Sequence, residues 1–218
     1  MNIRLLSIYA VVTGKLLAGV DGSVKIHGIP ATKPDEKLYL AAARSFQGGH
    51  WATSARWFDE LISRFPDSSR RTKATLLLGQ ALFQQENYRE AYGFLSNNRL
   101  AAGELSDEYL YWMAECRLGQ GNLDAANQVF AELLRSFPKS ARVLEATVAS
   151  AFVAAEREDW IRVVTLLRPA EGVFQVQAGN GFEEDVLQEG GLLLAEALLE
   201  QKNPTSARLL LDKFPRAL

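Results

Sequence analysis

One eleven-residue pattern occurs twice in the chain and constrains its fold more than any other feature. Residues 58–68 and 130–140 both read F-x-E-L-[IL]-x-x-F-P-x-S, at an offset of 72 residues. Because 72 is twice 36, the offset predicts a further copy between the two. Large residues at spacings of 37, 35, 37 and 44 give the frame, and we call these five residues the anchors: Trp51, Tyr88, Leu123, Trp160 and Pro204. The sequence therefore predicts about five repeats.

Residues around the anchors recur in a fixed phase. Three residues after each anchor stands a small or slim residue: Ser54, Ala91, Ala126, Val163 and Ala207. Seven residues after it stands a large apolar one: Phe58, Leu95, Phe130, Leu167 and Leu211. Nine residues before it stands another small one: Ala42, Gly79, Ala114, Ala151 and Ala195. Offsets of three and seven share one face of an α-helix. We therefore expect a helix ending just before each anchor and a second helix beginning at it.

The stretch before each anchor is turn-like and holds Gly, Asn or acidic residues, and Gly and Asn tolerate the left-handed conformation that ends a helix. The unit is then helix, short turn, helix. One such pair cannot bury both of its apolar stripes, so successive pairs must stack. The expected fold is all-α, an α-solenoid of about five antiparallel helix pairs.

This phasing resembles the tetratricopeptide (TPR) family, whose pattern is W-x2-L-G-x2-Y, then A-x3-F, then P. The resemblance covers roughly residues 35–215. Matching residues are Phe58 and Pro66 in the first copy, Leu78, Gly79, Leu82 and Ala91 in the second, and Ala126, Phe130 and Pro138 in the third. No copy has the leading Trp, and the fourth has Val163 where Ala is usual. The resemblance implies a right-handed superhelix that binds proteins. The F-P-x-S endings resemble divergent repeats of bacterial cell-envelope proteins, which favours a periplasmic or envelope location over a cytoplasmic one.

The expected domain organisation has three parts. Residues 1–34 precede the solenoid, residues 35–215 form it, and residues 216–218 end the chain. The first part is either a weak signal peptide, with an apolar stretch over 5–12, or a short β-hairpin turning at Asp21-Gly22. An insertion at about 170–181 explains the last spacing of 44 residues. It is either a recognition element or a tolerated surface loop.

Composition excludes several function classes. The 24 basic and 26 acidic side chains give a net charge of −2, without the basic excess on which nucleic-acid binding relies. No apolar run is long enough to span a bilayer. The single Cys116 is expected to be a buried core thiol, and His50 and His27 to be a turn residue and an isolated residue. We expect no catalytic set, no metal site and no cofactor, and hence no enzyme.

The first helix of each pair should line the inner face of the solenoid. Residues there that point away from the second helix form the expected binding row, which consists of Tyr39, Phe46, Gln47, Leu76, Gln80, Phe83, Gln84, Tyr111, Glu115 and Phe152. Rings bury area and amides bond a peptide backbone, so this mixture suits a peptide or protein segment. The alternative is that the phenylalanines pack between the first helices of neighbouring pairs. The row lacks the basic cluster that would hold a terminal carboxylate.

The predicted function is therefore a scaffold for protein–protein interaction. Residues 144–218 carry seven basic and twelve acidic side chains, which favours a neutral or basic partner segment. The apolar stretch Leu209-Leu210-Leu211 with Phe214 has no obvious polar cap, so we also expect an exposed apolar end and self-association through it. The alternative function is a self-assembling spacer or an accessory domain of a larger protein.

Overall fold

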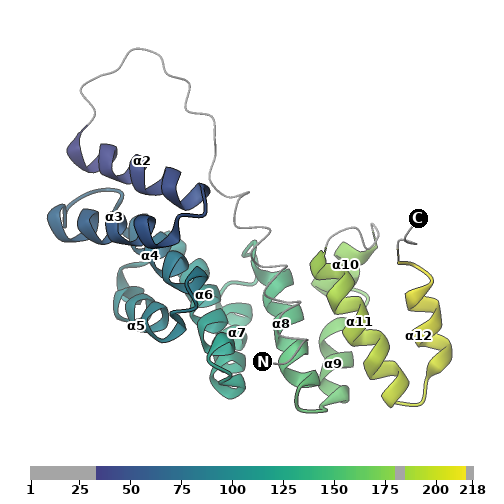
Figure 1. Ribbon diagram of the computed structural model, residues 1–218. Helices are drawn as coiled ribbons and strands as arrows, with labels where there is room; N and C mark the ends of the chain where they lie inside the picture. Colours follow the sequence, from purple (N-terminus) through teal and green to yellow (C-terminus); the bar gives the residue numbers. More distant parts are fainter. Residues whose placement is uncertain (1–32, 180–184, 215–218) are drawn as a thin grey trace. The chain divides into compact units, whose positions relative to one another are not determined.

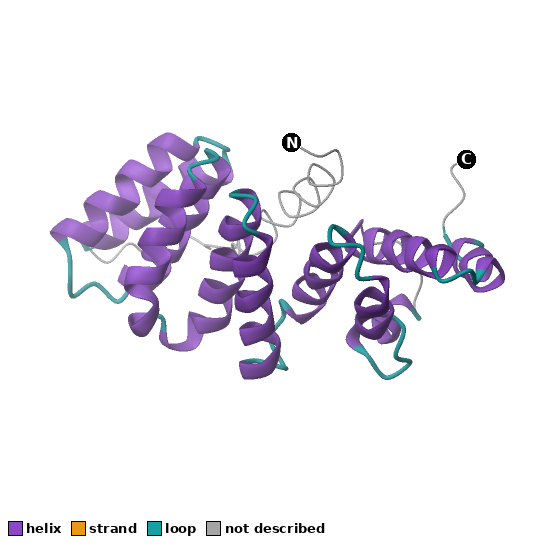
Figure 2. Ribbon diagram, turned by 90° about the horizontal axis from the view of Figure 1, so that it is seen from below, coloured by secondary structure: helices purple, strands orange, loops and turns teal. Residues whose placement is uncertain are grey.

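The computed structural model describes residues 33–179 and 185–214 (Figure 1). Figure 2 shows that helices and their connecting turns make up these residues, with no strand among them. The described chain divides into two compact units, residues 33–129 and the described residues from 130 onward. Both alternatives for the N-terminal segment, and the end at 216–218, lie outside the described residues.

The first unit is a series of consecutive helices that pack side by side. It contains α2 (Pro34–Gln47), α3 (Trp51–Arg64), α4 (Arg71–Gln84), α5 (Tyr88–Asn98) and α6 (Ser106–Gly119), and it ends within α7 (Leu123–Ser136). Two short 3-10 turns, η1 (Arg99–Ala101) and η2 (Gly103–Leu105), join α5 to α6. Each helix from α2 to α5 packs against the next one along the chain.

The second unit begins at Phe130 within α7. It continues with α8 (Val143–Ala155), α9 (Trp160–Leu167), α10 (Val173–Ala178), α11 (Asp185–Glu200) and α12 (Pro204–Leu211). Helix α11 packs against α8, α9 and α12, and the short α10 packs against α8 and α11.

The helix starts confirm the predicted frame. Helices α3, α5, α7, α9 and α12 begin at the five anchors. The small residues nine before the anchors are at most 3% exposed where a value is given, as for Ala42 and Ala195. In the first pair, the Ser54 hydroxyl donates a hydrogen bond to the Ala42 carbonyl at 3.1 Å, which requires the close backbone approach that small residues permit. The expected all-α fold of helix–turn–helix pairs is therefore confirmed.

The turn inside each pair uses one conformation throughout. The residue two before each anchor has a positive φ: Gly49 (74°), Glu86 (61°), Gly121 (72°), Glu158 (58°) and Lys202 (59°). The left-handed residue therefore comes directly before the Asn or Asp of the turn. Asn had been expected to adopt the left-handed conformation as well as Gly. These Asn and Asp residues cap the next helix instead, because the side chains of Asn122, Asp159 and Asn203 accept hydrogen bonds from backbone N–H groups three residues on.

Helix α2 has Lys33 at its N-cap position and Pro34 at the first helical position. Proline fits there because its missing N–H would have no partner in the first turn.

Residues 170–181 contain α10, which contributes to the core. The Phe174 side chain is fully buried, and the Gln175 side chain donates a hydrogen bond to the Leu167 carbonyl at 2.7 Å. A buried phenylalanine stabilises the fold by roughly 1.5–3 kcal/mol. This part of the insertion therefore holds α8 and α11 together and does not lie loose on the surface.

Candidate protein-binding surfaces

The ten residues of the expected binding row occupy four repeat positions. Tyr39, Leu76 and Tyr111 stand twelve before an anchor, and Gln80, Glu115 and Phe152 stand eight before one. Phe46 and Phe83 stand five before, and Gln47 and Gln84 four before. All belong to the first helices of their pairs, as expected, and the structure brings together those that share a helix, such as Leu76, Gln80 and Phe83 on α4.

Most of the row is buried. Eight side chains are 6% exposed or less: Tyr39, Phe46, Leu76, Gln80, Phe83, Tyr111, Glu115 and Phe152. Gln84 is half-buried and Gln47 is exposed. The row thus presents little ring surface, and Gln47 and Gln84 are its members with appreciable exposure.

Neighbouring aromatic rings account for much of this burial. The Phe83 ring packs edge-on against Tyr88 at 5.2 Å and against Trp112 of α6 at 5.3 Å. Phe46 meets Trp51 at 5.0 Å in the same geometry. Such pairs stabilise by about 0.5–1.5 kcal/mol beyond the burial of their area. Phe83 therefore packs between neighbouring first helices, which was the alternative to a direct binding role, whereas Phe46 packs against the second helix of its own pair.

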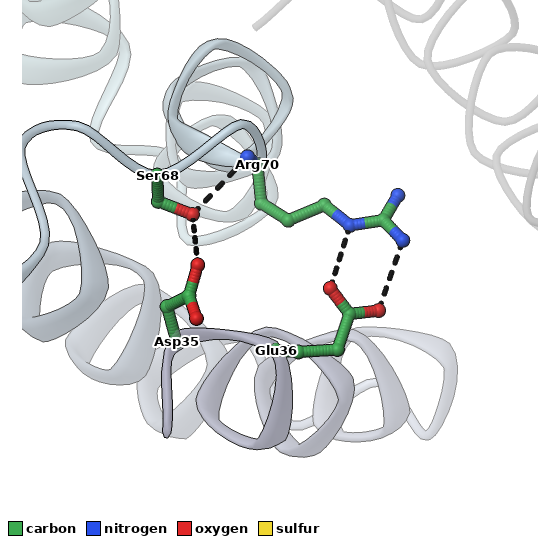
Figure 3. Close-up of polar contacts among 4 residues, drawn as sticks. All are labelled: Asp35, Glu36, Ser68 and Arg70. Carbon is green, nitrogen blue, oxygen red and sulfur yellow. Dashed lines mark hydrogen bonds and ion pairs between the residues drawn. The ribbon is translucent and has the colours of Figure 1, made fainter. Parts of the chain in front are cut away.

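Four polar residues beside Tyr39, which we call the latch, bind one another: Asp35, Glu36, Ser68 and Arg70 (Figure 3). The Ser68 hydroxyl donates to an Asp35 carboxylate oxygen at 2.6 Å, and the Arg70 guanidinium donates two hydrogen bonds of 2.9 Å to Glu36. The same guanidinium lies 5.2 Å from the centre of the Tyr39 ring. The hydrogen bond from Ser68 lowers the pKa of the Asp35 carboxyl, and burial raises the pKa of the Tyr39 phenol.

The latch joins the start of α2 to the turn before α4. Sequence reasoning missed it, although its signal is a pair of acids at a helix start and Ser-x-Arg in the following turn.

A second surface is a polar hollow of about 680 Å³ in the first unit. Residues of the turns of two successive pairs and of the start of α5 line it: Glu86, Asn87, Tyr88, Arg89, Glu90, Gln120 and Asn122. The Gln120 amide fixes one wall by donating to the Tyr88 carbonyl at 3.0 Å. Arg117 supports that wall, since its guanidinium lies 3.6 Å from the Tyr92 ring and donates to the Gln120 side chain at 3.1 Å.

The hollow offers carboxylates, amides and one cation to a ligand. Glu86, Glu90 and Arg89 are all exposed at its rim. Carboxylates accept hydrogen bonds from Lys, Arg or backbone N–H groups of a bound segment. Sequence analysis did not find this site, because its residues converge only when equivalent turns of successive pairs stack.

The residues with catalytic potential are dispersed. Cys116 is fully buried on α6, and burial raises the pKa of its thiol. His50 is exposed at the N-cap of α3, whereas His27 lies outside the described residues. Within the described ranges no three His, Cys, Asp or Glu residues gather as metal ligands would. In the same ranges, none of the helices combines the length and apolar character needed to cross a membrane.

Comparison with known proteins gives matches in family and in fold. The family model of anaphase-promoting complex, cyclosome, subunit 3 matches residues 47–133. Two crystal structures of nearly identical TPR-like repeats, from a candidate kinesin light chain of Podosopora anserina, each have a TM-score of 0.62 to this chain. They are 15% and 16% identical, and the alignments cover 81% of this chain and 91% and 90% of theirs. Comparison with curated protein sequences gives no match.

The fold and these likenesses define the class of protein. Helix–turn–helix pairs of about 36 residues, repeated in phase, make the chain a helical-repeat protein. More narrowly, its fold is similar to that of solved TPR-like repeat structures, in agreement with the phasing of its small and large residues.

Proposed function

We propose that this chain is a non-enzymatic scaffold that binds a protein or peptide segment along the first helices of its pairs. The TPR-like architecture carries the proposal, because stacked helix pairs present extended surfaces that such proteins use to hold partners. The ten residues of the binding row keep their proposed role in two parts. Gln47 offers its amide and Gln84 its amide oxygen to the backbone of the segment, while the eight buried side chains hold the helices that carry them.

The proposed partner segment is neutral or basic. The acidic excess of residues 144–218 supports this, and so do the exposed carboxylates of Glu86 and Glu90 in the polar hollow. Complementary charge speeds encounter and selects among partners more than it adds affinity. The envelope setting is also part of the proposal and rests on the F-P-x-S endings.

The test begins with capture of partners from cells of the source organism and continues with calorimetric titration of the captured segment. We expect Gln47→Ala with Gln84→Ala, or Glu86→Lys with Glu90→Lys, to weaken binding by about tenfold each. Asp59→Lys is the matched control, because Asp59 is exposed on α3 and belongs to neither surface.

Circular dichroism of each variant shows whether the fold is kept. A segment that binds all variants with wild-type affinity would remove both surfaces from the proposal. Failure to capture any protein would contradict the scaffold function itself. Cell fractionation addresses the location separately.

A further inference from the structure

The last helix pair exposes the face that earlier pairs bury. In the pairs α2–α3, α4–α5 and α8–α9, the next first helix belongs to the same unit. Their apolar side chains twelve and five before the anchor and seven after it are all buried. In α11–α12 the same three positions hold Leu192, Leu199 and Leu211, which are 56%, 52% and 40% exposed. We call these leucines, with Glu189 and Glu196, the end face.

Earlier pairs show what covers this face. In the first unit, the Trp112 ring of α6 packs on Phe83 of α4. Trp112 stands eleven residues before its anchor, and Phe83 stands five residues before its anchor. In the second unit, a Cβ placed on Gly190 of α11, fourteen before its anchor, would lie 3.0 Å from the Val148 side chain of α8, twelve before its own. The occupant of such a face is therefore a first helix that presents its residues fourteen and eleven before the anchor.

Helix α2, the first helix among the described residues, presents those positions to solvent or leaves them half-buried. Residues fourteen, eleven, ten and seven before the anchor are buried in α4, where they are Ala74, Leu77, Leu78 and Ala81. In α2 the same positions hold Lys37 and Arg44, which are exposed, and Leu40 and Ala41, which are half-buried. We call these four residues of α2, with exposed Lys33 before them, the start face.

The two faces have opposite charge. At pH 8, above the pKa of about 7 that burial gives Glu189, the start face carries Lys33, Lys37 and Arg44 and the end face carries the carboxylates of Glu189 and Glu196. The latch of the first unit supplies the geometry, because Arg70, eighteen before its anchor, donates to Glu36, fifteen before its own (Figure 3). Lys33 and Glu189 hold the same two positions at the start and end faces.

We infer that a second copy of this chain docks head to tail, with α2 of one copy packed on α11 and α12 of the other. Its Lys33 then lies opposite Glu189, the aliphatic part of its Lys37 side chain lies over Leu192, and its Leu40 covers Leu199. A contact between two different faces is heterologous, so it builds rings or open rows of copies rather than a two-fold dimer. With few apolar side chains on each face, we expect a dissociation constant of about 10–100 µM. This self-association does not depend on the proposed binding of partner segments.

Sedimentation velocity of the full chain over a range of concentrations tests the inference. The wild type should sediment faster as its concentration rises, and less so when salt is raised from about 0.05 M to about 0.5 M. The end variant, Leu192→Glu with Leu199→Glu, and the start variant, Lys37→Glu with Arg44→Glu, should each self-associate at least about tenfold more weakly. All four positions are exposed, so circular dichroism should show the wild-type fold.

Mixing provides the decisive comparison. Each variant keeps one intact face, so equal amounts of the two should form heterodimers with wild-type affinity and go no further. Ile161→Glu is the control, because Ile161 is 75% exposed on α9 outside both faces, and it should associate as the wild type does.

Three results would overturn the inference. A wild type that stays monomeric up to about 1 mM means that another segment or a different partner covers the end face. A start variant that still associates alone means that two end faces meet. A mixture that stays monomeric means that the start face is not the occupant.

Discussion

Two helical glycines should respond in opposite directions to the same substitution. Gly79 on α4 lies against Leu95 of α5, and a Cβ placed there would lie 2.6 Å from both Cγ and Cδ2 of that leucine. A Cβ placed on Gly93 of α5 would have no neighbouring group within 4 Å. Alanine is favoured over glycine in a helix by about 0.8–1.0 kcal/mol. Only the surroundings of the two positions therefore separate the outcomes.

The magnitudes follow from these contacts. Gly93→Ala should stabilise the chain by about 0.5–1 kcal/mol through helix propensity. Gly79→Ala gains the same propensity, but carbon atoms pack at about 3.5–4.0 Å, so Leu95 or helix α5 must shift. Overpacking of a core costs about 1–3 kcal/mol, which leaves a net loss of up to about 2 kcal/mol.

Urea unfolding followed by circular dichroism measures both variants. Adding Leu95→Ala to Gly79→Ala should cost less than the sum of the two single changes, since the smaller side chain removes the overlap. Gly79→Ala with wild-type or higher stability would refute the reasoning that a small residue is needed nine before the anchor for the two helices to approach.

Three further predictions concern other described contacts. Glu86→Gly should leave stability unchanged or raise it by up to about 1 kcal/mol, because φ is 61° at this position and only glycine adopts that conformation without strain; a thermal melt showing clear loss would contradict this. Arg70→Ala should lower the free energy of unfolding by about 0.5–1.5 kcal/mol, because it removes both hydrogen bonds to Glu36. In urea titrations, added salt should make the difference in this free energy between variant and wild type smaller. Burial raises the pKa of Glu189 from 4.5 to about 7, so this carboxyl favours folding when protonated and loses that contribution as pH rises from about 4.5 through 7. Glu189→Gln should therefore be more stable than the wild type by about 2 kcal/mol at pH 8, but not at pH 4, and equal melting curves at pH 8 would exclude the effect.

The repeat frame could be predicted because it follows from periodicity alone. Helices begin at Trp51, Tyr88 and the other anchors since small and large residues recur in one phase around them. The left-handed turn residue could be located only as Gly49 and Gly121, since nothing about the side chains of Glu86 or Lys202 indicates a positive φ. There the repeated geometry overrides local preference.

The burial of the binding row could not be predicted in full. The phase of Phe83 or Tyr111 identifies the helix face on which it lies, but not how far the surrounding structure covers that face. That extent depends on the size of particular neighbours, as with Trp112 against Phe83. The binding role of the row remains a prediction. The polar hollow was missed for a related reason, since turn residues distant in sequence meet only after stacking.

The phenylalanine of α10 has a consequence for how this chain could change through evolution. A Cβ on Gly190 would come within 2.4 Å of the Phe174 ring, so the bare backbone of one helix is matched to the ring of another segment. Neither residue could be exchanged for that of a standard repeat without the other. Deleting α10 would therefore leave a cavity beside Gly190, and a larger residue at position 190 would overlap the Phe174 ring. We expect Gly190 and Phe174 to be conserved together.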